Sequence, residues 1–70
     1  MTIQQDLQQF AELIGKRDPN TARLCRNAAN LPTIPYAMME ALRMQIDELH
    51  GLSVDGSLIL AKMRKHRCEF

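Results

Sequence analysis

Apolar residues recur at helical spacing along most of the chain, and this pattern constrains the fold more than any other feature. At about 3.6 residues per turn, spacings of three and four place side chains on one face of a helix. The first such stripe consists of Ile3, Leu7, Phe10 and Ile14. The second consists of Met39, Leu42, Ile46 and Leu49. Because the alternation typical of strands is nearly absent, the pattern predicts amphipathic helices that each bury one face.

Prolines divide the chain into four predicted helices. Pro19 suits the first position of a helix, whereas Pro32 and Pro35 push the residues before them into extended geometry, so the segment that leads to residue 35 is not helical. The expected helices cover about residues 2–14, 19–29, 35–50 and 54–67 of a single domain, residues 1–70. We therefore predict an all-α fold, a small bundle of three to four short helices. Since the apolar residues of the second helix are mostly small, we expect it to be a basic flap over a core made by the other three.

Residues that cap helices stand at the predicted boundaries. Thr2 and Asp18 are typical N-cap residues for the first two helices. For the fourth helix, Ser53 and Asp55 are both suitable, and the sequence leaves the choice open. The residues expected to end helices in a left-handed conformation are Gly15 and Gly51.

A chain of 70 residues supports only a small core. Below about 70–80 residues a single core rarely supplies more than about 3–5 kcal/mol, and small proteins often add disulfides, a metal or oligomerisation. Two cysteines, Cys25 and Cys68, do not make the disulfide framework of a secreted domain. We therefore expect homodimerisation or partner binding to complete the fold.

No segment of the sequence is typical of membrane targeting or insertion. The first residues have no basic region followed by an apolar run, so no signal peptide is predicted. No apolar stretch approaches the roughly 20 residues of a membrane span. We accordingly expect a cytoplasmic protein with reduced thiols.

The helix over 35–50 carries the residues predicted to bind a partner protein. Methionine is flexible and polarizable, and five methionines in so short a chain are typical of an adaptable binding surface. The predicted apolar site consists of Tyr36, Met38, Met39, Leu42, Met44 and Ile46. One hypothesis is a homodimer built on the helices over 2–14 and 35–50. The alternative is that Tyr36 and Met44 pack beneath a neighbouring helix of their own chain.

Positive charge is concentrated in two segments, although the formal net charge is only +1. The predicted basic site, for a protein or a nucleic acid, consists of Arg23, Arg26, Lys62, Arg64, Lys65 and Arg67. Such groups attract phosphates or an acidic protein surface, or pair with acidic residues of their own chain. The helix over 35–50 is a poor DNA-binding element because Glu40, Asp47 and Glu48 would repel phosphates.

No residue pattern indicates catalysis, a metal or a cofactor. Four residues have zinc-binding chemistry but not the spacing of a zinc site: Cys25, His50, His66 and Cys68. Asp47 and Glu48 are adjacent on a predicted helix, so their side chains diverge. A glycine-rich phosphate loop is absent from the sequence. We therefore do not expect an enzyme.

These observations lead to one preferred function and one alternative. The preferred function is a small protein-interaction module, a regulator, adaptor or inhibitor, that docks on another protein through an apolar helix face flanked by basic residues. The alternative is a small DNA-binding transcriptional regulator that uses the helix over 19–29 and the basic C-terminal tail.

Overall fold

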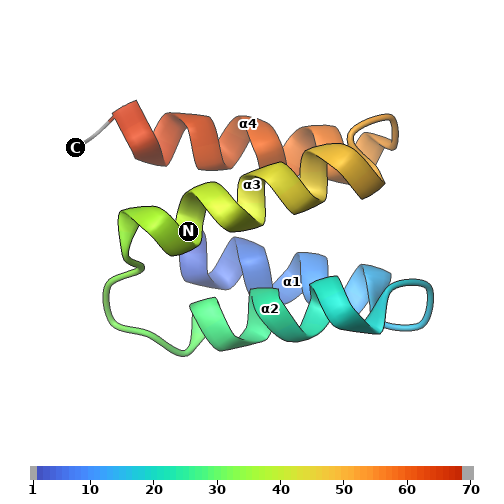
Figure 1. Cartoon of the computed structure of the whole chain (residues 1–70), viewed down its shortest axis with the longest axis horizontal. Helices are drawn as coiled ribbons and strands as arrows, with labels where there is room; N and C mark the ends of the chain where they lie inside the picture. Colours follow the sequence, from blue (N-terminus) through green and yellow to red (C-terminus); the bar gives the residue numbers. More distant parts are fainter. Residues whose placement is uncertain (1, 69–70) are drawn as a thin grey trace.

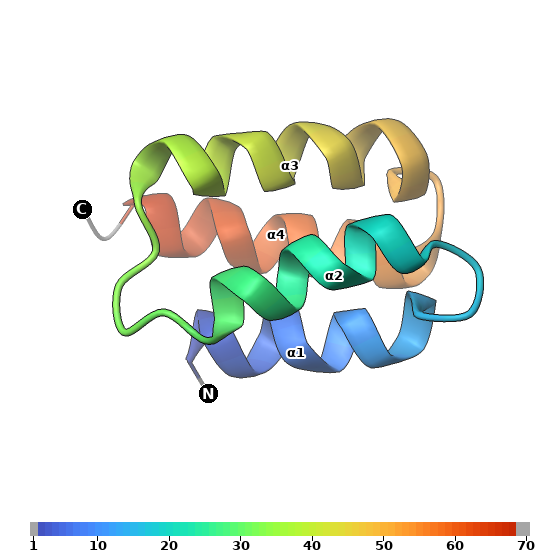
Figure 2. The same ribbon diagram turned by 60° about the horizontal axis from the view of Figure 1, so that its bottom comes forward.

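The protein is an up-and-down bundle of four helices. The computed structural model describes the backbone of residues 2–68 and the side chains of residues 2–66. The helices are α1 (Ile3–Ile14), α2 (Pro19–Ala29), α3 (Tyr36–His50) and α4 (Val54–Cys68), and the described range contains no strand. Consecutive helices are antiparallel, and α1 and α3 each pack against both α2 and α4 (Figures 1 and 2). The two pairs α1–α3 and α2–α4 are therefore diagonal, and the predicted all-α bundle is confirmed.

Side chains cap the first two helices as predicted. Thr2 Oγ1 accepts a hydrogen bond from the Gln5 N–H at 3.2 Å, and the Gln5 side chain accepts one from the Thr2 N–H at 3.1 Å. Asp18 Oδ1 accepts a hydrogen bond from the Thr21 N–H at 3.2 Å. Each cap satisfies a backbone donor that has no acceptor inside its helix, and such a cap contributes about 1 kcal/mol.

Ser53, and not Asp55, caps α4. Its hydroxyl group accepts a hydrogen bond from the Gly56 N–H at 3.0 Å, and its O–H donates one to the carbonyl oxygen of His50 at 2.8 Å. The Ser53 side chain therefore ties the end of α3 to the start of α4. Asp55 lies in the first turn of α4, where the positive end of the helix dipole favours a carboxylate.

The prediction of left-handed glycines at the helix ends is wrong. Gly15 has φ −54° and Gly51 has φ −61°, both right-handed. Helix-type hydrogen bonds continue past both ends: the Asp18 N–H donates to the Ile14 carbonyl at 2.7 Å, and the Gly51 N–H donates to that of Asp47 at 3.1 Å. These bonds satisfy the terminal carbonyls, so a left-handed residue is not needed there.

Helix α2 is part of the core, which corrects the prediction of a flap. The buried residues of α2 are Thr21, Ala22, Cys25 and Ala28, all at 0% exposure. Their small side chains allow the backbones of α1 and α2 to come close together, and this is the most extensive helix pair in the bundle. The polar group among these buried side chains is the hydroxyl of Thr21, and its oxygen accepts a hydrogen bond from Gln45 Nε2 at 2.8 Å. Small residues therefore mark close helix packing here, and not weak packing.

The connector between α2 and α3 is also held to the bundle. Ile34 is buried, and the Gln4 side chain of α1 donates to the carbonyl oxygens of Leu31 at 3.3 Å and Pro32 at 3.1 Å. The proline-containing segment thus crosses one end of the bundle with its backbone partly hydrogen-bonded. Within the described residues, no helix is both long and apolar enough to cross a lipid bilayer.

Candidate protein-interaction site

Three of the six residues predicted to form an apolar docking site lie in the core instead. Met39, Leu42 and Ile46 are 6%, 2% and 0% exposed. Their heptad spacing is the strongest apolar pattern of α3, and the chain uses that stripe against its own helices. Tyr36 and Met44, both 61% exposed, and Met38 remain accessible to a partner.

The accessible apolar residues of α3 continue onto α2, on one side of the bundle. The Gln45–Thr21 hydrogen bond identifies the side of α3 that faces α2. Side chains three or four positions apart are neighbours on a helix, so Leu24 shares the side of Thr21, and Ala41 and Leu49 share the side of Gln45. Met38 lies three positions from Ala41, and Met44 lines one surface hollow together with Ala41, Gln45 and Leu49. We call this surface the α2–α3 face. It consists of Leu24, Met38, Ala41, Met44 and Leu49.

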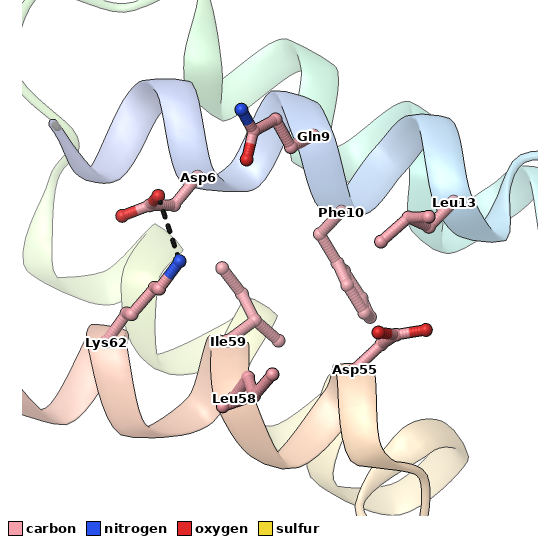
Figure 3. A pocket seen from close by; sticks show the side chains of 8 residues that line it. All are labelled: Asp6, Gln9, Phe10, Leu13, Asp55, Leu58, Ile59 and Lys62. Atoms are coloured by element: carbon pink, nitrogen blue, oxygen red, sulfur yellow. Dashed lines mark hydrogen bonds and ion pairs between the residues drawn. The ribbon is translucent and has the colours of Figure 1, made fainter.

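A groove lies on the other side of the bundle, between α1 and α4. It has a volume of about 90 Å³. We call it the α1–α4 groove, and its lining residues are Asp6, Gln9, Phe10, Leu13, Asp55, Leu58, Ile59 and Lys62 (Figure 3). Phe10 and Ile59 form a buried floor, whereas Leu13 is 58% and Leu58 is 56% exposed at the rim. The groove therefore combines an apolar floor with two leucines that face solvent.

Charged side chains lie at both ends of the α1–α4 groove (Figure 3). Lys62 Nζ donates to Asp6 Oδ1 at 3.2 Å, which links α4 to α1 (Figure 3). Asp6 is nearly buried, so the ion pair compensates a carboxylate that has lost most of its water. Asp55 lies at the opposite end of the groove, beside the ring of Phe10 (Figure 3). No side chain among the described residues forms an ion pair with it. The groove thus keeps one carboxylate available to a cationic group.

The predicted basic residues do not converge on one surface. Arg23 and Arg26 are exposed on α2, and Arg64 and Lys65 are exposed on α4. Since these two helices are diagonal, their exposed sides point in opposite directions (Figure 1). Lys62 lies in the groove, and the side chain of Arg67 is outside the described residues. The described side chains of the predicted basic site therefore do not lie on one continuous face.

His50 is part of a polar cluster at the end of the bundle. Its Nε2 lies 2.9 Å from Asp18 Oδ2, and its ring packs edge-on against Phe10 with centroids 5.5 Å apart. Hydrogen bonds from Thr21 and His50 hold the pKa of Asp18 below its usual range. The nearby Ser53 hydroxyl donates to a backbone carbonyl and not to the imidazole. The cluster therefore joins helix ends and does not have the arrangement of a nucleophile and a base.

Cys25 is a core residue. It is fully buried in α2, and burial, followed by the charge of Asp18, raises its pKa to about 11. A thiol with so high a pKa is a poor nucleophile at neutral pH. Among the described residues, no three His, Cys, Asp or Glu side chains are grouped so that they could hold a metal ion. The side chain of Cys68 lies outside the described residues.

Two of these features could not be read from the sequence. Asp18 and His50 are 32 positions apart, and Leu13 and Leu58 belong to none of the periodic apolar stripes. Comparison with protein families, curated proteins and solved structures gives no match to this chain. Its function must therefore be inferred from the surfaces described above.

Proposed function

We propose that the protein is a small non-enzymatic protein-binding module whose partner inserts an apolar side chain into the α1–α4 groove. The observation that supports this most directly is the groove itself, with its buried floor of Phe10 and Ile59 between the exposed Leu13 and Leu58. Binding energy in protein complexes is concentrated where an anchor side chain fills such a hollow and excludes water.

The size of the groove favours a side chain over a small-molecule ligand. Its volume is about 90 Å³. Typical ligand sites have about 300–1,000 Å³, and a dry cavity of about 150 Å³ accepts benzene. The α1–α4 groove suits one aliphatic side chain presented by a larger surface.

The charges of the groove define the partner further. The sequence predicts an apolar face flanked by basic residues, whereas the charged residues that line this groove are Asp6, Asp55 and Lys62. Since Lys62 pairs with Asp6, the available charge is the carboxylate of Asp55. We expect the partner to place a lysine or arginine beside Asp55, which would orient the complex and increase its rate of association.

The test is affinity capture from a lysate of the source organism with the wild-type protein, Leu58→Glu and Met44→Glu. Both substituted residues are exposed, so circular dichroism should show unchanged helix content. We expect wild type and Met44→Glu to retain one discrete protein at near-equal amounts, with or without nuclease, and Leu58→Glu to lose it. Retention by Leu58→Glu would contradict the groove as the docking site. Loss of the captured material on nuclease treatment would favour the DNA-binding alternative instead.

A further inference from the structure

Helix α3 has a second stripe, on the side away from the core. It consists of Ala37, Ala41, Met44 and Glu48, which are spaced by four, three and four residues and are all exposed. This spacing is that of a seam between two packed helices. The core of the chain uses the other stripe, so this seam is not occupied within the chain.

We propose that the α2–α3 face, together with Ala37 and Glu48 of the seam, joins two copies of this chain in a two-fold symmetric dimer, with α3 antiparallel to α3 of the second copy. The two-fold axis passes between residues 42 and 43. Met44 then lies opposite Ala41 of the second copy, and Ala41 lies opposite its Met44. A long flexible side chain meets a small one at both places, so the seam is complementary to itself, as a two-fold interface requires.

The charges of α3 favour this antiparallel arrangement. The helix begins at Pro35 without a side-chain cap, so the N–H groups of Ala37 and Met38 have no acceptor inside the helix. The other end of α3 carries Asp47 and Glu48. The antiparallel register places Glu48 beside the first turn of α3 in the second copy, at the positive end of its dipole. A parallel pair would instead bring the carboxylates of both copies together, which is repulsive.

The area of the α2–α3 face also fits a dimer. A standard interface buries about 800 Å² on each partner. That is about a sixth of the exposed surface of the chain, 4847 Å². An interface of this area would cover one whole side of a bundle that measures 31 × 22 × 22 Å. Both α2 and α3 must therefore contribute to it. The Thr21–Gln45 hydrogen bond sets Leu24 level with the middle of α3, where it would meet Leu24 of the second copy.

The first test is sedimentation equilibrium of the wild-type protein, Met44→Glu and Leu13→Glu. The two variants introduce the same charge at similar exposure, 61% and 58%, on opposite sides of the bundle. We expect a wild-type dimer and a dissociation constant raised by at least about 30-fold in Met44→Glu, the effect of losing one anchor residue. Leu13→Glu should dimerise as the wild type does. A monomeric wild type, or dimerisation that Leu13→Glu impairs and Met44→Glu does not, would overturn the proposal.

The second test determines the register. Every chain carries Cys68→Ser, so that the remaining native cysteine is the buried Cys25. An equal mixture of Ala41→Cys and Met44→Cys chains should form a disulfide-linked heterodimer under mild oxidation, because these residues face each other within disulfide reach. Ala37→Cys alone should not cross-link, since the two copies of residue 37 are about 16 Å apart along the helix axes. Efficient cross-linking of Ala37→Cys would show a parallel pair and overturn the register. Loss of groove binding in Leu58→Glu leaves this dimer unaffected, so the two proposals fail separately.

Discussion

The substitution Gly56→Ala tests the close packing between α3 and α4. A Cβ atom at this position would lie 2.6 Å from the carbonyl carbon and 2.9 Å from the Cβ of His50, and it would overlap the His50 carbonyl oxygen. His50 has little freedom to move away, because its ring is held by Asp18 and packs on Phe10. The backbone at the α3–α4 corner must therefore shift to accept even one methyl group.

Two opposing effects determine the magnitude. Alanine is favoured over glycine inside a helix by about 1 kcal/mol. Overpacking against neighbours that cannot move costs about 1–3 kcal/mol, and contact with backbone atoms places this case at the upper end. We expect a net loss of about 1–2 kcal/mol, which lowers the melting temperature of a domain of this size by about 4–16 °C. This is a large share of the roughly 3–5 kcal/mol that so small a core supplies.

The assay is urea unfolding followed by circular dichroism, with Gly15→Ala as the matched control. Gly15 is also right-handed, and an added Cβ would lie 3.2 Å from the Ala11 carbonyl oxygen and 3.4 Å from the exposed guanidinium of Arg26, which can move. Gly15→Ala should change the free energy of unfolding by between zero and about +1 kcal/mol. If Gly56→Ala is as stable as Gly15→Ala, the argument from close packing is refuted.

Three further predictions concern the core and the polar corner. Because the pKa of Asp18 is lowered in the folded protein, the stability it contributes is present above about pH 4 and is lost as the pH falls through the folded pKa. The urea midpoint of the wild type should accordingly decrease on acidification more than that of Asp18→Asn, and equal decreases would contradict this. In a Cys68→Ser background, iodoacetamide should leave Cys25 unmodified in the native protein and modify it in urea; rapid native modification would show that the thiol is accessible. Leu42→Asp should unfold the chain at every protein concentration, because the side chain of Leu42 is only 2% exposed and a carboxylate there would be buried. A folded monomer, seen by circular dichroism and sedimentation, would contradict this prediction.

Local features of the sequence were enough to predict the helices. The four observed helices start and end within one or two residues of the predicted bounds. Thr2 and Asp18 cap their helices as expected, because an N-cap forms hydrogen bonds within three residues of itself. The left-handed glycines were predicted wrongly, because the path of the chain after Gly15 and Gly51 is set by the packing of the next helix and not by the glycine.

The candidate surfaces were only partly predictable. The α3 residues at heptad spacing, Met39, Leu42 and Ile46, were predicted to form a docking face and are core. Periodicity identifies an apolar side of a helix but not what covers it. The α1–α4 groove was missed because Leu13 lies beside the stripe of its helix, and Leu58 lies in a run of apolar residues, 58–61, that points all round its helix. Only the packing of α1 against α4 brings these two leucines to one groove.

The sequence by itself determined the helical class and the approximate boundaries of the helices, because these depend on interactions between residues at most four positions apart. The tertiary structure decided which apolar stripe became core, that α2 belongs to it, and that the basic residues of α2 and α4 face opposite ways. It also brought Asp18 to His50 and Asp6 to Lys62. These outcomes follow from the order in which four helices surround one core, and that order depends on contacts between segments far apart in the chain.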